Sequence, residues 1–92
     1  MAKAVITIKI MPESPESDLT KIEEEAKKMI ADFAGEGETK TEIEPVAFGL
    51  KALKIIFVMD ESKGSPDPVA EKVNGIRGVN SAEITDVRRA IG

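Results

Sequence analysis

The sequence contains no cysteine and no histidine among its 92 residues. Without cysteine the chain cannot form a disulfide, a thiolate nucleophile or a thiolate metal site. Without histidine it lacks the commonest general base and the commonest metal ligand of proteins. We therefore expect a protein that is not an enzyme, that needs no cofactor and that has no metal site.

Aromatic residues are scarce, and there is no excess of basic residues. Phenylalanine is the only aromatic residue type, present three times, and the formal net charge is −4. Nucleic-acid-binding domains usually carry a basic excess, and many RNA-binding sheets stack bases on aromatic side chains. Direct binding of nucleic acid is therefore not expected.

Long apolar segments are also missing. The most apolar run, residues 55–59, is far too short to span a bilayer, and residues 1–4 lack the apolar core of a secretion signal. The length suits one hydrophobic core. We expect a single domain over residues 1–92, located in the cytoplasm and without a membrane partner.

Three segments have patterns typical of β-strands. Residues 3–11 place alanine and three isoleucines on one face, which predicts a half-buried strand. Residues 39–47 form a more polar strand. Pro45 has no amide hydrogen to donate, so this strand is predicted to lie at a sheet edge or to carry a bulge at that point. Residues 51–59 are apolar on both faces, which predicts a central strand.

A helix is predicted between the first two strands, because apolar residues follow one another there in steps of three and four. Ser14 or Ser17 can cap its start, and Pro15 suits the first helical position. Gly35 and Gly37 are expected to end it. The apolar face consists of Leu19, Ile22, Ala26, Met29, Ile30 and Phe33.

A second, shorter helix is predicted with Ser65 as its cap and Pro66 in its first turn, ending at Asn74 and Gly75, before a last strand. The interval from Ile84 to Val87 breaks the alternation of that strand, which predicts a bulge near residues 85–86.

The predicted order of elements is strand, helix, strand, strand, helix, strand. This is the ferredoxin-like βαββαβ pattern of an α+β protein. Right-handed crossovers then place the first and third strands in the centre of a four-stranded antiparallel sheet, with both helices on one face. The other face is left open, and it carries some apolar side chains that suggest a binding surface.

Two pairs of residues are candidate sites. Phe48 and Gly49 follow the second strand, and the aromatic ring is either a hydrophobic plug of a turn or an anchor for a protein partner. Arg88 and Arg89 form either a solvated end of the last strand or a positive group that competes for carboxylates or displaces a metal in a partner.

Residues 45–55, Pro-Val-Ala-Phe-Gly-Leu-Lys-Ala-Leu-Lys-Ile, resemble a run in the exchange domain of translation elongation factor 1-beta. In that family the run reads Pro-Val-Gly-Tyr/Phe-Gly-Ile-Lys-Lys-Leu-Gln-Ile. The opening strand with its acidic helix and a last strand beginning Ser-Ala-Glu-Ile also fit. The length of about ninety residues is similar to the archaeal form.

The resemblance implies a guanine-nucleotide exchange factor that releases GDP from elongation factor 1-alpha, so that GTP can rebind. It places Phe48 against the GTP-binding domain of the partner, with Gly49 and Lys51 in the same motif. It also directs Arg89, with Arg88 beside it, towards the magnesium and phosphate site. The free protein is expected to be monomeric.

A second interpretation remains open from the residues alone. Small ferredoxin-like domains also serve as regulatory modules that sense small molecules and pair through their edge strands. This interpretation predicts a defined dimer with a ligand pocket between its subunits. The polar edge strand with Pro45 argues mildly against such pairing.

Overall fold

The computed structural model describes residues 3–35 and 37–90. Its helices and strands follow the βαββαβ order that the sequence predicts, which confirms the α+β ferredoxin-like class. In chain order they are β1 (Lys3–Pro12), α1 (Leu19–Ala34), β2 (Thr39–Pro45), the 3₁₀ turn η1 (Ala47–Gly49), β3 (Lys51–Asp60), the 3₁₀ turn η2 (Glu61–Lys63), α2 (Asp67–Asn74) and β4 (Val79–Ala90).

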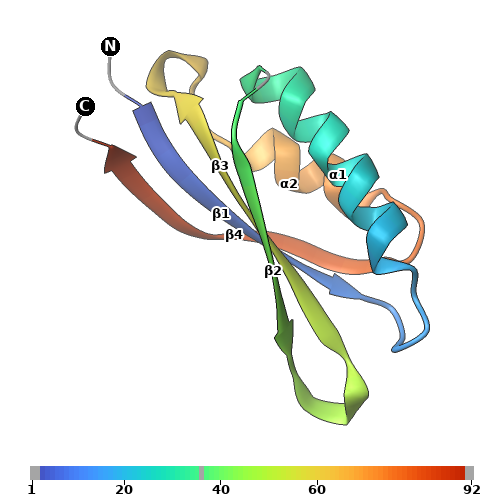
Figure 1. Cartoon of the computed structure of the whole chain (residues 1–92). Coiled ribbons are helices and arrows are strands. Elements are labelled where there is room, and N and C mark those ends of the chain that lie inside the picture. The colour runs from blue at the N-terminus through green and yellow to red at the C-terminus, as the bar shows by residue number, and fades with distance from the viewer. Residues whose placement is uncertain (1–2, 36, 91–92) are drawn as a thin grey trace.

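The four strands form one antiparallel sheet in the order β2-β3-β1-β4. The central and edge positions are therefore as predicted, and Pro45 is the last residue of the edge strand β2. Both helices cover the same face, and the hairpin formed by β2 and β3 extends beyond them (Figure 1). This arrangement leaves the tip of the hairpin without a covering layer.

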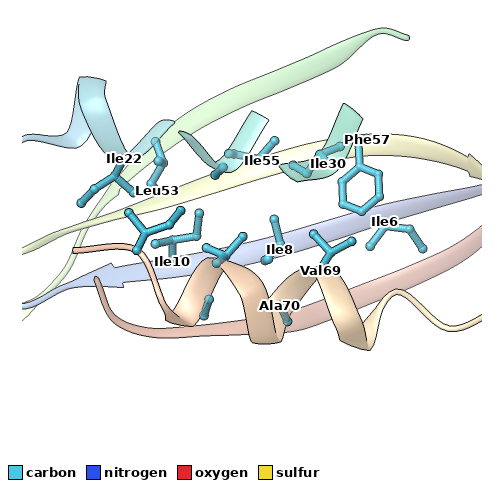
Figure 2. Packing of buried hydrophobic residues seen from close by; sticks show 14 of the residues in the cluster. Ile6, Ile8, Ile10, Ile22, Ile30, Leu53, Ile55, Phe57, Val69 and Ala70 are labelled. Carbon is cyan, nitrogen blue, oxygen red and sulfur yellow. The ribbon is translucent and has the colours of Figure 1, made fainter. Parts of the chain in front are cut away.

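The core lies between the sheet and the two helices (Figure 2). Alternate residues of β1 point into it, and β3 contributes Leu53, Ile55, Phe57 and Met59, all nearly inaccessible to solvent. Each fully buried side chain of this kind stabilises the fold by about 1.5–3 kcal/mol. β3 is therefore held firmly along its length, and it provides a rigid base for the hairpin tip.

Helix α1 begins later than the sequence analysis predicts. Asp18 is its N-cap, and the carboxylate accepts a hydrogen bond from the amide of Lys21 at 3.2 Å. The predictions of a cap at Ser14 or Ser17 and of Pro15 at the first helical position are therefore wrong. The predicted end of the helix at the glycine of position 35 is confirmed. Helix α2 also begins later than predicted: Pro66 and not Ser65 is its N-cap residue, and the Ser65 hydroxyl accepts a hydrogen bond from the amide of Asp67 at 3.1 Å.

The hydroxyl of Ser17 makes a tertiary contact instead. It accepts a hydrogen bond from the amide of Ser14 at 3.3 Å and donates to the carbonyl of Gly78 at 3.4 Å. The amide of Glu13 donates to the same carbonyl at 2.9 Å. These bonds fasten the loop between β1 and α1 to the turn before β4, which explains why the helix starts only after residue 18.

Strand β4 contains the predicted bulge. Thr7 pairs with Asp86 while the next residue, Ile8, pairs with Ile84, so Thr85 is the extra residue. The insertion restores the alternation beyond it, and the last residues of β4 keep a fixed orientation relative to β1.

The side chain of Asn74 joins α2 to β4. Its amide nitrogen donates to the carbonyls of Ala70 at 3.0 Å and Ala82 at 2.9 Å, and its oxygen accepts from the amide of Ala82 at 2.9 Å. One side chain therefore ends the helix and fixes the start of the last strand.

Candidate functional site

The hairpin tip is closed by two backbone hydrogen bonds. The amide of Val46 donates to the carbonyl of Leu50 at 2.8 Å, and the amide of Leu50 donates to the carbonyl of Ala47 at 3.3 Å. Between them lies η1, which contains Phe48 and Gly49. The tip is therefore a small closed loop with a defined backbone.

Phe48 is the most exposed large apolar residue among those the structure describes, with 93% of its surface accessible. Its backbone is left-handed, with φ 63° and ψ 30°. This conformation costs a residue other than glycine about 1–2 kcal/mol. Strain and exposure at the same residue are typical of functional positions. The structure excludes the interpretation of Phe48 as a plug.

Gly49 and Lys51 follow Phe48 at the hairpin tip. Gly49 has φ 75°, a left-handed backbone that glycine adopts without strain. Lys51 is exposed and pairs with Pro45 at the start of β3. A groove of about 270 Å³ separates these residues from the loop before α1, and Pro15 lines its other side. Gly49 and Lys51 therefore line one side of this groove, at the same hairpin tip that carries Phe48.

Arg88 and Arg89 point to opposite faces of the sheet. Arg89 pairs with Ala4, whose side chain is in the core layer, while Arg88 pairs with Val5 on the open face. Successive residues of a strand alternate in this way. The two guanidinium groups therefore do not form one positive tip.

Each arginine has a carboxylate partner. The Nε and Nη2 atoms of Arg89 donate to the two carboxylate oxygens of Glu61, at 2.9 and 3.1 Å. These hydrogen bonds raise the pKa of Arg89, so its charge is fixed at every pH of interest. Arg88 donates from Nε to Asp86 at 2.9 Å. Ile91 and Gly92, which follow the arginines in the sequence, lie outside the described residues.

The candidate residues fall into two groups at opposite ends of the sheet. The hairpin tip precedes the first residue of β3, whereas Arg89 lies opposite Ala4, which itself pairs with Met59 near the end of β3. Lys51 and Met59 are eight steps apart along one strand, or about 26 Å. The structure thus groups Phe48 with Gly49 and Lys51, and places Arg89 far from them.

Two residues at these ends were not identified from the sequence. Glu61 binds Arg89 across 28 positions of the chain, and no periodic pattern predicts such a pair. Ile43 lies on β2 with 55% of its surface accessible, although its strand position opposite Leu53 is on the helix side. Leu53 itself is fully buried on the central strand β3, so Ile43 is exposed at the edge of the sheet.

The open face of the sheet is confirmed, but its character is mixed. Val5 and Ile56 are half-buried there, and 40% of Val58 is accessible. Lys54 forms an ion pair with Glu44 on the same face. The charged side chains among them limit the continuous apolar area of this face. It is therefore a weaker candidate for a binding surface than the hairpin tip.

Two other kinds of site find no support in residues 3–35 and 37–90. Neither α1 nor α2 has the length and apolar character of a membrane-spanning helix. Within the same residues, no group of three or more acidic side chains is arranged to hold a metal ion.

Comparison with known proteins identifies the family. The family model described as the EF-1 guanine nucleotide exchange domain matches residues 5–90. The chain belongs to this family. The resemblance to translation elongation factor 1-beta is therefore confirmed, and the family carries out guanine-nucleotide exchange in translation elongation.

Archaeal proteins named elongation factor 1-beta match over nearly their whole length. The protein of Methanothermobacter thermautotrophicus is 42% identical over 89 residues, which cover 97% of this chain and 98% of the relative. That of Sulfolobus acidocaldarius is 43% identical over 86 residues, with coverages of 92% and 93%. That of Methanobrevibacter smithii is 42% identical over 92 residues, with coverages of 97% and 98%.

Proposed function

We propose that this protein binds elongation factor 1-alpha and promotes release of its GDP, so that GTP can rebind. The observation that carries the proposal is the ring of Phe48, which is exposed at the hairpin tip in a strained backbone conformation. An aromatic side chain held outside the core contributes nothing to folding by burial. It becomes a large source of binding energy when a partner encloses it.

Exchange of this kind requires only differential binding. A factor that binds the nucleotide-free partner more tightly than the GDP-bound partner weakens GDP binding by the same ratio. Each tenfold change in affinity corresponds to about 1.4 kcal/mol. Enclosing an aromatic anchor is worth about 2 kcal/mol or more. The Phe48 contact alone therefore supplies more than a tenfold effect if it forms mainly in the nucleotide-free state.

Arg89 is proposed as the second contact. A guanidinium group binds phosphate and carboxylate oxygens through paired hydrogen bonds, so it can compete with a magnesium ion for the same ligands. The partner reached by both Phe48 and Arg89 must extend along most of the long axis of the molecule, which measures 42 Å. Arg88 faces the other side of the sheet, where it is proposed to add affinity through its charge.

The proposed activity places the protein in the cytoplasm, together with the translation machinery. It also requires that the hairpin tip and the Arg89 end are both free before the partner binds. We therefore expect a monomer in the absence of the partner. Sedimentation at high protein concentration checks this expectation, and a stable dimer would favour the alternative of a regulatory module that pairs through its edge strands.

The direct test is the release of labelled GDP from an archaeal elongation factor 1-alpha. Excess unlabelled nucleotide is added with and without a substoichiometric amount of this protein. The proposal predicts faster release with multiple turnovers per molecule of factor. An unchanged release rate over the full range of factor concentrations would overturn it.

A further inference from the structure

We propose that Glu61 is a positioning residue for Arg89. Its carboxylate binds one edge of the guanidinium group, so that the free edge faces an anionic group in the nucleotide site of the partner. This inference rests on the proposed function, because it assumes that Arg89 contacts the partner. It starts from the two hydrogen bonds that join the side chains, at 2.9 and 3.1 Å.

The pair leaves the useful donors of Arg89 free. A guanidinium group has five N–H donors in a planar fork. Glu61 takes the Nε–H and one hydrogen of Nη2. The remaining edge, formed by Nη1 and Nη2, still carries two parallel donors, the arrangement that binds a phosphate or carboxylate bidentately. Arg89 keeps 71% of its side-chain surface accessible, so this edge can be reached from solvent.

The order of the strands determines the path that the Arg89 side chain takes to reach Glu61. Arg89 lies on β4 and Glu61 follows β3, with β1 between them. The β1 residue at this level is Ala4, which pairs with Arg89 on one side and Met59 on the other. Its single methyl group lets the longer side chain cross over β1. The small residue at this position of β1 therefore permits the contact between Arg89, near the end of β4, and Glu61, directly after β3.

Glu61 is itself held in place. It is the first residue of η2, and its carbonyl accepts a hydrogen bond from the amide of Gly64 at 3.1 Å. The carboxylate of Asp60 accepts from the amide of Ser62 at 2.9 Å and caps the same turn. The anchor of Arg89 is therefore a structured turn that directly continues the central strand β3.

An arginine side chain that is already held in place loses less conformational entropy on binding than a mobile one. A long side chain that is already confined loses little further rotamer freedom when its partner arrives. This saving in entropy lowers the barrier of the step in which the guanidinium group of Arg89 enters the nucleotide site of the partner. Loss of Glu61 is therefore expected to lower the GDP release rate at saturating factor by about threefold to tenfold, the scale of immobilising one side chain. The half-saturating concentration of factor is expected to change less than twofold, because the hairpin contact is untouched.

The experiment compares wild type, Glu61→Ala, Arg89→Ala and the double variant in the GDP release assay. Glu61→Ala is expected to slow saturated release, and Arg89→Ala is expected to slow it further. The double variant is expected to match Arg89→Ala, because Glu61 acts only through Arg89. Glu23→Ala is the matched control. It also removes one acidic member of a surface ion pair, at 2.7 Å from Lys27 on α1, and it is expected to leave the rate unchanged.

The outcomes separate this inference from the proposed function. If Arg89→Ala slows release but Glu61→Ala does not, or speeds it, the positioning role is overturned and the proposed function stands. If Glu61→Ala slows release equally with and without Arg89, the inference is also overturned. If neither variant has any effect while wild type remains active, the contact role of Arg89 fails, and the positioning role fails with it. Thermal unfolding of each variant identifies any loss caused by misfolding.

Discussion

Phe48 and Arg89 lie at opposite ends of the sheet, separated by nearly the full length of β3. Figure 1 shows the hairpin tip and the end of β4 pointing away from each other. A partner that touches both therefore meets two distant contacts held by one rigid strand. Such a partner is contacted at two separate points and not over one compact surface.

Distant contacts that share no neighbours are expected to act additively. The loss of transition-state free energy in a Phe48→Asn, Arg89→Ala double variant should equal the sum of the two single losses within about 0.5 kcal/mol. The measurement is GDP release under conditions of limiting factor. A double variant no worse than the more damaged single variant would show that the two residues act as one unit.

Asn74→Ala is expected to destabilise the fold by about 2 kcal/mol, because two hydrogen bonds between α2 and β4 and one within α2 are lost, and the amide and carbonyl of Ala82 lose their partner. In a domain of this size the unfolding midpoint falls by about 8–16 °C. Thermal unfolding followed by circular dichroism measures the change. Asn80→Ala, an exposed position of the same strand, serves as the control. A midpoint no lower than that control would refute the joining role.

Much of this architecture follows from local patterns in the sequence. The interrupted alternation between Ile84 and Val87 predicted the bulge, because a strand that buries one face must absorb an odd residue somewhere. Pro45 predicted the edge position of β2 because it cannot donate to a neighbouring strand.

Other features depend on tertiary contacts that no local pattern encodes. Ser17 is a good cap by residue type, yet its hydroxyl binds the carbonyl of Gly78, which is 61 positions away. The exposure of Phe48 depends on the left-handed backbone at one residue and on how far the hairpin extends beyond the helices. The pair of Arg89 with Glu61 arises from the meeting of two strand ends. These features carry most of the candidate site.

The carboxyl group of Glu44 is expected to titrate below its ordinary pKa of 4.5, because Lys54 hydrogen-bonds to it and attracts its negative charge. A lowered pKa in the folded state means that the pair stabilises the fold above the unfolded pKa. The contribution is lost as the pH falls through the folded value. Carboxyl NMR titration measures this pKa, and Lys54→Gln should raise it towards 4.5. A value at or above 4.5 in wild type would contradict the pairing.

Gly49→Ala is expected to destabilise the protein by about 1–2 kcal/mol, because alanine is strained at φ 75°. The same change should slow exchange by distorting the neighbouring ring. Gly37→Ala is the control, since that glycine has no atom near an added methyl group and lacks a positive φ. Chemical denaturation of both variants checks the prediction. Equal stability of the two would show that the hairpin tip readily adopts another conformation.

The exchange activity of Phe48→Asn tests the role of the Phe48 ring most directly. Asparagine tolerates the left-handed backbone, and the ring it replaces is 93% exposed, so the variant should be at least as stable as wild type. Phe48→Tyr keeps an aromatic ring as the matched control. We predict that Phe48→Asn slows GDP release from elongation factor 1-alpha at least about tenfold, while Phe48→Tyr stays near wild type. A folded Phe48→Asn protein that releases GDP at the wild-type rate would contradict it.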